Sequence, residues 1–304
     1  MIEVLRAGQC DLVMDRGRPR FGALGVPAGG AADPAALAAA NRLVGNEDSG
    51  AGLEITLSGP SLRFPAGGVA ALTGAQFVAA RSSGGPVPWN ETLVLAAGET
   101  LTLASAESGS RCWLALRGGL AVPPVMDSRS TFLPGAFGGH VGRPLRAGDV
   151  LALGDQGGRL RLRRAQPPAA AELSVPLRVV AGPQAGQFDN AGLVAFFGGV
   201  FRVAAASDRR GLRLSGPTVA RARMELPSQG VLPGAVQVPP DGQPIILGWD
   251  GPVTGGYPVI AGVISADLPR LAQLRPGDEV RFATIEVDAA RALAATNWKI
   301  EDLA

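Results

Sequence analysis

The sequence predicts a mainly β protein of two domains, and three observations support this. Its 304 residues exceed what a single hydrophobic core commonly organises. Gly (43) and Pro (25) are abundant without a collagen-like period, in a chain that is 46% hydrophobic. This composition is typical of many short strands joined by tight turns. Short runs of alternating apolar and polar residues recur along the whole chain, as strands require.

In the first half, strands are expected at the N-terminus and between Leu53 and Arg117. The clearest helix covers 33–46, where Asp33 can cap the first turn, Pro34 suits the first helical position and Gly45 can end the helix. A long irregular stretch, 117–143, follows the strands, and loops of this length in compact domains are often functional. A further hairpin is expected in 148–164.

Residues 165–172, AQPPAAAE, have the composition of a linker. We therefore predict an N-terminal domain over 1–166 and a C-terminal domain over 173–304. The second domain should contain strands, a short helix near 189–197, another in 266–274, and a C-terminal helix from about 287. A turn-plus-strand element recurs at 97–105, 147–154 and 276–284, which suggests two related β-domains, although such short elements also recur by chance.

Composition excludes several classes of partner. The net charge is +2 and no block of Lys or Arg appears, so we expect no nucleic-acid binding. No run of about 18 apolar residues and no signal peptide is found, so we expect neither membrane insertion nor export. Cys10 and Cys112 are far apart in sequence, which indicates reduced thiols and a cytoplasmic protein. Charged residues make up only 18%, so a partner is expected to cover part of the surface.

Several kinds of catalytic site are also excluded. The single histidine, His140, has no nearby partners for a nucleophilic triad. The chain has no H-E-x-x-H, no CxxC and no His/Cys cluster, so a bound metal is not expected. It also has neither a P-loop nor a strand–GxGxxG–helix unit, the two commonest nucleotide-binding motifs. What remains is Arg, Asp, Gln, Ser and Thr on Gly-rich turns, which can act by positioning and electrostatic stabilisation.

The longest such segment is 228–258, in which 13 of 31 residues are Gly or Pro. Turns of this kind hold polar side chains rigidly, so little entropy is lost when a ligand orders them. Each polar cluster taken alone is more typical of a structural turn network than of a site. Four of them in a chain with so little charge make a site as well supported as a structural role. The four clusters are Asp15/Arg16/Arg18, Ser128/Arg129/Ser130/Thr131, Ser207/Asp208/Arg209 and Gln237/Asp250/Thr254/Tyr257.

Long motifs in a fixed order carry a family resemblance. They include DRGR (15–18), GVPAGGAADPAAL (25–37), LEITLSGP (53–60), SRST (128–131), SDRRGLRLSGP (207–217) and TGGYPVIAGVISADLPRLAQLRPGD (254–278). With these motifs the chain resembles the biotin-dependent carboxyltransferase-like family. That family includes the C subunit of 5-oxoprolinase, KipA, and the second half of the carboxyltransferase region of urea carboxylase. The resemblance extends from about residue 3 to about residue 290.

The resemblance implies a fold of two cyclophilin-like β-barrel domains. It also implies a complex with two partners, the A subunit of 5-oxoprolinase and its KipI-like B subunit. Such a complex opens 5-oxoproline (pyroglutamate) to L-glutamate with ATP hydrolysis. ATP is then needed by the complex and is not necessarily bound by this chain. Two alternatives stay open: a KipA-like regulator that binds a KipI-like kinase inhibitor, and the carboxyltransferase half of a urea carboxylase-like system.

Two departures favour the 5-oxoprolinase subunit over a carboxyltransferase. Val259 follows the GGYP motif, where urea carboxylase-like members often have a basic residue. No Met-Lys pair is present for covalent biotin, because Lys299 follows Trp298. On this reading we predict catalytic roles for Arg129, Arg209 and Asp250. The residues predicted to bind substrate are Arg16, Arg18, Ser128, Ser207, Asp208, Gln237, Thr254 and Tyr257.

Overall fold

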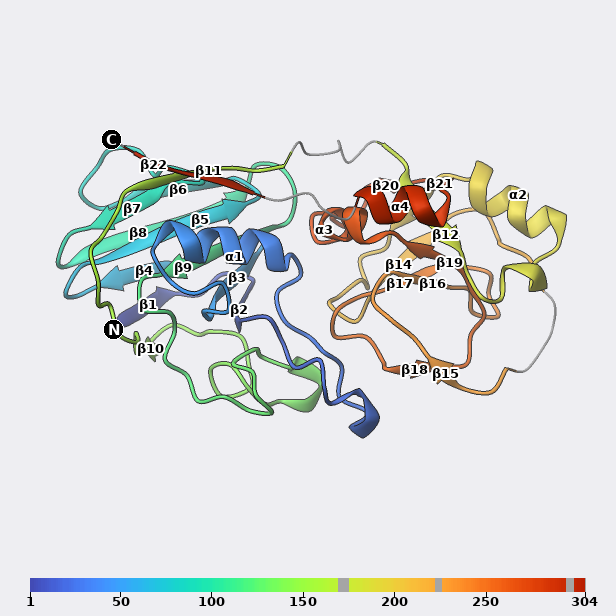
Figure 1. The fold of residues 1–304 in the computed structure, drawn as a ribbon, viewed down its shortest axis with the longest axis horizontal. Helices are drawn as coiled ribbons and strands as arrows, with labels where there is room; N and C mark the ends of the chain where they lie inside the picture. Colours follow the sequence, from blue (N-terminus) through green and yellow to red (C-terminus); the bar gives the residue numbers. More distant parts are fainter. Residues whose placement is uncertain (169–174, 222–225, 294–297, 304) are drawn as a thin grey trace. The chain divides into compact units, whose positions relative to one another are not determined.

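Strands supply most of the regular structure, in two units of the chain (Figure 1). The computed structural model describes residues 1–168, 175–221, 226–293 and 298–303. Unit 1 contains the described residues of Met1–Arg18, Gly29–Ala169 and Asn297–Ala304; unit 2 contains those of Pro19–Ala28 and Ala170–Thr296. The prediction of a mainly β fold with a few short helices is confirmed.

Unit 1 is built on two five-stranded antiparallel sheets. The first has the strand order β10 (Val150–Leu151), β1 (Ile2–Arg6), β4 (Ser61–Phe64), β8 (Glu99–Ala106) and β6 (Phe77–Arg81). The second has the order β2 (Cys10–Met14), β3 (Gly52–Thr56), β9 (Arg111–Leu116), β5 (Gly68–Gly74) and β7 (Thr92–Leu95). Along β8 most residues alternate between buried and half-exposed, as expected when one face of an antiparallel sheet meets a core and the other meets solvent.

The inner faces of the two sheets meet in one hydrophobic core. Leu62 and Phe64 from the first sheet and Leu53, Ile55 and Leu114 from the second are fully buried there. Burying a side chain of this size contributes about 1.5–3 kcal/mol. The alternating apolar residues of the sequence therefore form the contact between the sheets.

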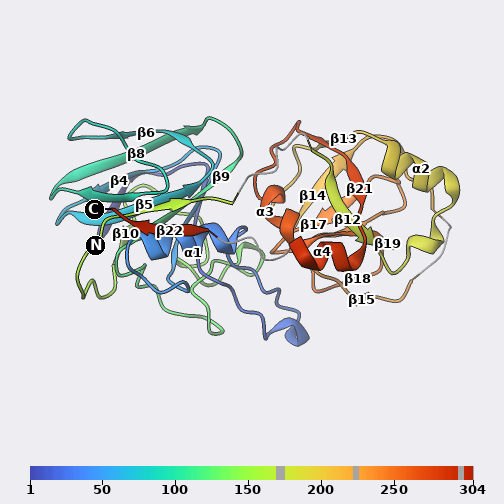
Figure 2. The same cartoon turned by 45° about the horizontal axis from the view of Figure 1, so that its top comes forward.

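Helix α1 (Pro34–Leu43) covers the outer face of the second sheet (Figures 1 and 2). The carboxylate of Asp33 accepts the N–H groups of Ala35 and Ala36, both at 3.0 Å. Such an N-cap is worth about 1 kcal/mol. A two-stranded sheet, β11 (Arg163–Gln166) with β22 (Lys299–Asp302), packs beside the helix. The predicted first helix is confirmed, with its predicted cap.

Unit 2 contains an eight-stranded sheet that nearly closes on itself. Its strand order is β20 (Glu279–Val280), β13 (Phe201–Val203), β14 (Gly211–Ser215), β17 (Ile245–Leu247), β16 (Ala235–Gln237), β19 (Val259–Val263), β12 (Leu177–Ala181) and β21 (Phe282–Thr284). The two edge strands are separated in sequence by Arg281 alone, so the chain steps from one edge of the sheet to the other. A separate pair, β15 (Gln229–Gly230) with β18 (Thr254–Gly255), carries part of the Gly/Pro-rich segment.

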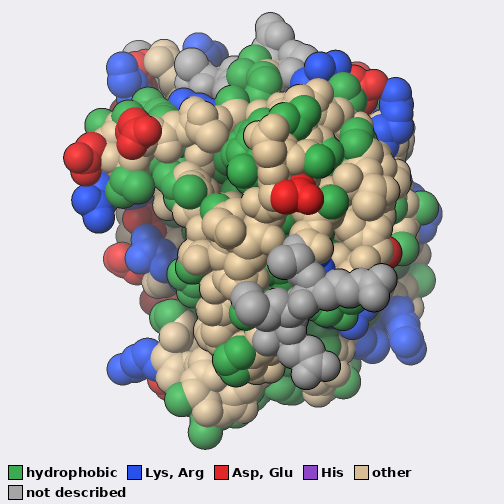
Figure 3. All heavy atoms as spheres, turned by 90° about the vertical axis from the view of Figure 1, so that its right-hand side faces the viewer, with side chains coloured by type: hydrophobic (Ala, Val, Ile, Leu, Met, Phe, Trp, Pro, Cys, Tyr) green, Lys and Arg blue, Asp and Glu red, His purple; other side chains and the backbone are tan. Residues whose placement is uncertain are grey.

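Helix α2 (Asn190–Gly198) packs on the core of this sheet through Phe196, whose ring stacks on Phe282 at 4.3 Å between centroids. Asp189 caps it by accepting the N–H of Gly192 at 2.7 Å, so the helix predicted near 189–197 is confirmed. No residue of α2 is charged, and Val194 is 63% exposed. Figure 3 faces the side of Figure 1 on which α2 lies, and most charged side chains there are at the margins.

Two shorter helices lie near the end of the chain: α3 (Leu268–Leu271), which follows a 3-10 turn (Ser265–Asp267), and α4 (Val287–Leu293). Asp267 is fully buried between Arg178 and Arg270, and these contacts tie the 3-10 turn to β12. Burial alone would raise the pKa of Asp267, but the hydrogen bonds from Arg178 and the charges of Arg178 and Arg270 together lower it. Three further 3-10 turns are Gly22–Leu24, Leu133–Gly135 and Ala185–Gln187.

The end of the chain differs from its predicted assignment. The predicted domains, 1–166 and 173–304, place the last residues in the second domain. The helix predicted from about 287 is confirmed as α4, but it does not extend to the end of the chain. In the structure α4 is followed by β22, which pairs antiparallel with β11 of unit 1 from Lys299↔Gln166 to Asp302↔Arg163. Trp298 and Ile300 pack on the apolar cluster around α1, which explains the return. The predicted linker, 165–172, begins inside β11, and its residues from 169 on lie outside the described part of the chain.

Candidate functional site

The carboxylate of Asp15 ties the end of β2 to the loop at 128–130. Its Oδ1 accepts hydrogen bonds from Ser128 Oγ (2.6 Å), Ser130 Oγ (2.6 Å) and the N–H of Gly17 (2.8 Å), and its Oδ2 accepts the N–H of Arg129 (2.5 Å). Both serines are almost fully buried. Four donors occupy both oxygens, so this carboxylate holds the loop in place. The hydroxyl of Ser128 is turned inward, and a contact of Ser128 with substrate stays a prediction.

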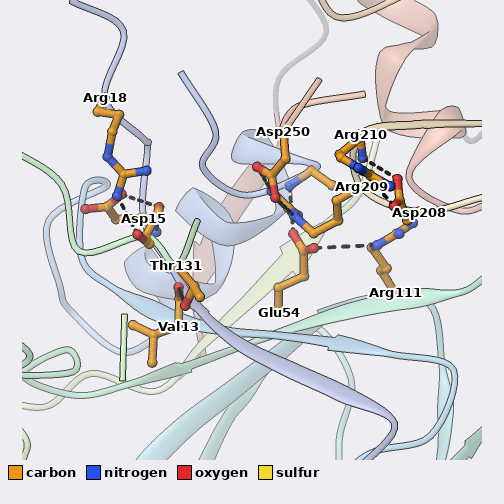
Figure 4. A network of polar contacts seen from close by, with 12 residues as sticks. Val13, Asp15, Arg18, Glu54, Arg111, Thr131, Asp208, Arg209, Arg210 and Asp250 are labelled. Atoms are coloured by element: carbon orange, nitrogen blue, oxygen red, sulfur yellow. Dashed lines mark hydrogen bonds and ion pairs between the residues drawn. The ribbon is translucent and has the colours of Figure 1, made fainter. Parts of the chain in front are cut away.

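Arg18 lies close to Asp15 (Figure 4). Its side chain is buried, with 1% exposed. Its Nη2 donates to the carbonyl of Ser130 and its Nε to that of Val125 at 3.5 Å, while Cζ lies 5.1 Å from the ring centroid of Phe137. Gly138 has φ 72°, and a Cβ there would lie 2.2 Å from the carbonyl oxygen of Ser130. Arg18 is therefore a buried support for the loop, and a direct contact with substrate stays a prediction.

Arg129 is the member of this loop whose side chain reaches the surface. Its Nε donates to the carbonyl of Val122 at 3.0 Å. The preceding Met126 and Asp127 have φ values of 50° and 61°, a strained combination for residues other than Gly. Strain of this kind persists only where the surrounding contacts hold it, and here the backbone of Arg129 is fixed on its inner side. An exposed guanidinium on a fixed loop is suited to binding a carboxylate.

Arg16, although close to Arg18 in sequence, joins a surface ion pair. Its Nη2 lies 3.0 Å from Asp48, which also accepts from Arg42 Nε at 2.6 Å. These hydrogen bonds from Arg42 and Arg16 lower the pKa of Asp48. Exposed ion pairs are worth about 0–1 kcal/mol, so this contact leaves Arg16 available for exchange.

In unit 2, Arg209 and Asp250 form a buried bidentate ion pair (Figure 4). Arg209 Nε lies 2.8 Å from Asp250 Oδ2 and Nη2 lies 3.2 Å from Oδ1; the side chains are 7% and 1% exposed. The backbone N–H of Asp250 donates to the carbonyl of Arg209 at 3.1 Å. A Cβ on Gly248 would lie 2.3 Å from that carbonyl, so the close approach requires Gly. Two residues predicted from separate clusters thus form one unit that joins two turns.

The neighbouring residues Ser207 and Asp208 shape the tight turn that presents Arg209. Ser207 Oγ accepts the N–H of Arg213 at 3.0 Å. Asp208 is exposed, and it accepts both the N–H (2.8 Å) and the Nε (2.9 Å) of Arg210. These contacts are local to the turn, so Ser207 and Asp208 have structural roles, and their contact with substrate stays a prediction.

Gln237, Thr254 and Tyr257 meet at the β18 segment. Gln237 is 4% exposed, and its Nε2 donates to the carbonyl of Tyr257 at 3.4 Å. A Cβ on Gly255 would lie 2.6 Å from the same Nε2, so Gly255 permits the close packing. Thr254 is exposed and Tyr257 is 44% exposed. Gln237 therefore supports from below a strip of chain whose polar side chains face solvent.

A buried carboxylate that the sequence analysis missed lies under the segment before α1. Glu54 of β3 is 0% exposed; its Oε2 accepts the N–H of Ala32 (2.7 Å) and Nε1 of Trp113 (3.2 Å), and its Oε1 lies 3.5 Å from Arg111 Nε. Burial, with a contribution from the charge of Glu54, raises the pKa of nearby Asp33. The signal was present: Glu54 alternates with buried leucine and isoleucine in a strand whose outer face a helix must cover.

The described ranges contain no group of three or more His, Cys, Asp or Glu side chains placed to hold a metal ion.

His140, the single histidine, lies beside Asp149. Its Nε2 lies 3.3 Å from Asp149 Oδ1, and Arg143 binds the same carboxylate with two hydrogen bonds of 2.8 Å. These contacts, led by the Arg143 hydrogen bonds, hold the pKa of Asp149 well below its usual range. Within the part of the chain that is described, no helix is both long and apolar enough to cross a bilayer.

Residues 24–284 match the family model described as "Carboxyltransferase domain, subdomain A and B". The chain belongs to this family. The C subunit of 5-oxoprolinase from Escherichia coli (strain K12) is 40% identical over 291 residues, covering 95% of this chain and 93% of the relative. The solved structure of TTHA0988 superimposes with a TM-score of 0.83 at 38% identity, covering 93% of this chain and 55% of that one. K. lactis urea amidolyase gives a TM-score of 0.85 at 32% identity, covering 95% of this chain and 19% of that one.

Several polar side chains outside the motifs given above hold turns in unit 1. Asn46 donates to the carbonyl of Leu116 at 2.7 Å and accepts the N–H of Gly118 at 2.8 Å. Asn41 donates to the carbonyl of Gly50 at 2.7 Å. Arg117 donates to three carbonyl groups in 156–158. These contacts are within unit 1, so the three side chains have structural roles.

Proposed function

We propose that this chain is the C subunit of an ATP-dependent 5-oxoprolinase, which opens 5-oxoproline to L-glutamate together with its A and B partners. The observation that carries the proposal is the similarity to the C subunit of Escherichia coli 5-oxoprolinase over 95% of this chain and 93% of that relative. Coverage of both chains matters, because K. lactis urea amidolyase contains this fold as a minor part of a longer chain.

Within this proposal, Arg129 is the group best placed to bind an anion. It is exposed, its backbone is fixed by Asp15, and its planar guanidinium can pair with a carboxylate through two hydrogen bonds. We propose that Arg209 and Asp250 act by holding the 248–251 turn, since both are buried and already paired. These residues would contribute orientation and electrostatic stabilisation, and no nucleophile is required of them.

We also propose that ATP is used by the complex and that this chain carries no covalent biotin, since Trp298 precedes its lysine, Lys299. A cytoplasmic location is part of the same proposal. It is supported by the two cysteines, which are not joined in a disulfide. Asp11 pairs with Ile55 and Ile55 with Cys112, so Cys10 and Cys112 lie on opposite faces of the sheet. Burial raises the pKa of the Cys112 thiol well above its ordinary value, which keeps it unreactive.

A carboxyltransferase role is the second candidate, because the family model carries that description and K. lactis urea amidolyase shares the fold. The departure at Val259 does not weigh against it. Val259 is 6% exposed and packs with Val231 and Leu247, so the side chain at this position faces the core. The nature of the partner proteins therefore separates the two candidates.

The test is reconstitution. The chain is purified alone and with candidate A and B partners, and glutamate released from 5-oxoproline is measured with and without ATP. We expect activity only in the full set with ATP. Arg129→Ala should lower that activity at least tenfold, whereas Arg146→Ala, another exposed arginine of unit 1, should leave it unchanged. Activity of the chain alone, or a full set that is inactive on 5-oxoproline but carboxylates urea with a biotin-bearing partner, would overturn the proposal.

A further inference from the structure

Beside the exposed strip at 254–257, two glutamine side chains form a closed amide pair. Gln184 Nε2 donates to Gln229 Oε1 at 3.0 Å, and Gln229 Nε2 donates to Gln184 Oε1 at 2.9 Å. Gln229 lies opposite Gly255 in the β15–β18 pair, so the amide pair adjoins the Gly-rich strip. Both glutamines are half-buried.

The two partners are held very differently. The backbone N–H of Val259 donates to Gln184 Oε1 at 3.0 Å, and the N–H of Gln184 donates back to the carbonyl of Val259 at 3.2 Å. This fixes the position of Gln184 and also which end of its amide is the oxygen. Gln229 lies on a two-residue strand, and within the described chain the hydrogen bonds of its amide are the two to Gln184. Gln184 is therefore an oriented amide edge, and Gln229 is an exchangeable partner for it.

Two glycines near the pair leave open space at their own backbone positions. Among the described residues, a Cβ built on Gly186, two residues after Gln184, would meet no atom within 4 Å, and the same is true of Gly230, next to Gln229. No side chain from either of these two positions can therefore block a small molecule that approaches the pair. The neighbouring Tyr257 is 44% exposed and offers an aromatic ring and a hydroxyl near the strip.

We propose that the amide of Gln184 binds the cis-amide edge of a lactam, and that Gln229 occupies this edge while no ligand is bound. A small ring forces the N–H and C=O of a lactam onto the same side of the C–N bond. The lactam then presents one donor and one acceptor side by side, the same pair that Gln229 presents. When a lactam takes the place of Gln229, Gln184 loses two N–H···O=C hydrogen bonds and gains two of the same kind. No polar group of Gln184 is then left without a partner. The inference rests on the proposed function, because 5-oxoproline is a lactam.

Urea presents the same edge. The chemistry recognised is therefore an N–H and a C=O on the same side of a C–N bond, which either a lactam or urea can supply. A site built on hydrogen bonds rejects a molecule that lacks one of them more strongly than an apolar pocket rejects a missing methylene. An N-methylated lactam lacks the donor and would leave Gln184 Oε1 without its second partner. Binding should therefore be at least tenfold weaker for the methylated ring.

The first test uses the full chain and needs no activity. The side-chain amide signals of Gln184 and Gln229 are followed by NMR during titration with 2-pyrrolidinone, N-methyl-2-pyrrolidinone and urea. We expect 2-pyrrolidinone to shift both sets of signals and the methylated ring to shift them at least tenfold more weakly. Urea binding more tightly than 2-pyrrolidinone would assign the edge to a urea-type ligand and overturn the lactam proposal. Equal responses to the two rings, or none to either, would overturn it as well.

The second test uses the reconstituted complex and two substitutions of equal size. Gln184→Met removes the amide edge and should raise KM for 5-oxoproline at least tenfold, with a smaller change in kcat. Gln229→Met removes the competing partner and should lower KM two- to tenfold. A purely structural pair predicts the same direction for both variants, and that result would overturn the proposal. Gln243→Met, on the same unit, is the matched control and should change neither constant. A complex that is inactive on 5-oxoproline while 2-pyrrolidinone still shifts the amide signals would contradict the proposed function alone.

Discussion

Asp11 should make unit 1 less stable as the pH rises through the mildly acidic range. The residue lies in β2 and is 1% exposed. Its Oδ2 accepts the N–H of Gly8 at 2.6 Å, whereas its Oδ1 has no hydrogen-bond partner among the described residues. Burial raises the pKa of Asp11 from 3.8 to about 6, against the opposing effects of the Gly8 hydrogen bond and the charge of Arg6. We predict that Asp11→Asn removes a pH-dependent loss of stability.

The sign and size follow from the two pKa values. Below pH 3.8 the carboxyl group holds its proton in both the folded and the unfolded chain, so its titration costs nothing. Between pH 3.8 and about 6 the unfolded chain releases the proton first, and stability falls as the pH rises. Above that range the loss is complete. About two pKa units at 1.36 kcal/mol each correspond to roughly 3 kcal/mol. The amide N–H₂ of an asparagine would itself lack an acceptor here, a cost of about 1–3 kcal/mol that is equal at every pH.

The assay compares urea unfolding of wild type and Asp11→Asn at pH 3.5 and pH 8. In a Trp249→Phe background the three remaining tryptophans, Trp89, Trp113 and Trp298, lie in unit 1, so fluorescence reports that unit. The stability of the variant relative to wild type should be about 3 kcal/mol more favourable at pH 8 than at pH 3.5, and the constant cost cancels in this difference.

Glu99→Gln is the control of opposite sign. The Arg81 hydrogen bond, aided by others, lowers the pKa of Glu99 to about 2, so the folded chain favours the ionised form. This variant should lose more stability at pH 8 than at pH 3.5. An Asp11→Asn effect that is the same at both pH values, or that is larger at pH 3.5, would refute the reasoning.

Three further substitutions test the contacts of the candidate site. Asp15→Ala removes the acceptor of four hydrogen bonds and should lower the stability of unit 1 by about 3 kcal/mol in urea unfolding. Asp250→Asn breaks a buried ion pair with Arg209 and should cost unit 2 about 3–5 kcal/mol, read from the adjacent Trp249. Gly255→Ala places a Cβ 2.6 Å from Gln237 Nε2 and should cost about 1–3 kcal/mol, measured as faster amide hydrogen exchange in β15 and β18.

Each of these has a matched control. Asp127→Asn changes an exposed residue of the same loop as the Asp15 contacts and, because Asn tolerates its φ of 61°, should change stability by less than about 0.5 kcal/mol. Asp208→Asn alters an exposed ion pair beside Arg209 and should cost less than about 1 kcal/mol. Gly186→Ala meets no neighbouring atom and should leave hydrogen exchange in β15 unaltered. Controls as costly as the test substitutions would mean that burial and hydrogen bonding do not set these energies.

Local signals in the sequence predicted local structure well. Helix α1 follows a residue that can cap it, and α2 follows Asp189 in the same way, so both helices lie where the sequence placed them. Alternation located most strands of unit 1. Strand β22 was missed because it pairs with β11, more than 130 residues earlier, and its four residues carry no mark of that partner. Pairing over such a separation depends on the packing of Trp298 and Ile300 against unit 1, which appears only once the fold is known.

The candidate site was predicted as residue types and not as a geometry. The sequence marked Arg209 and Asp250 as polar residues on separate turns, but their bidentate contact depends on the pairing of β14 with β17. It marked Ser128 for a ligand, but it did not predict that the hydroxyl donates to Asp15. Glu54 was overlooked, although it alternates with buried Leu53 and Ile55, because its hydrogen bonds with Ala32 and Trp113 appear only in the folded chain.

The return of the last strand to unit 1 bears on how the protein is made. From the earlier part of the described chain β11 has one isolated bridge, between Arg164 and Glu91, and β22 supplies its strand partner only at Lys299–Asp302. During synthesis from the N-terminus, β22 therefore reaches β11 only after the described residues of unit 2 have been made. The sheet beside α1 is completed by a segment that follows unit 2 along the chain, so its formation has to wait for that unit. A truncation before Trp298 would remove both the partner of β11 and the side chains of Trp298 and Ile300 from the apolar cluster around α1.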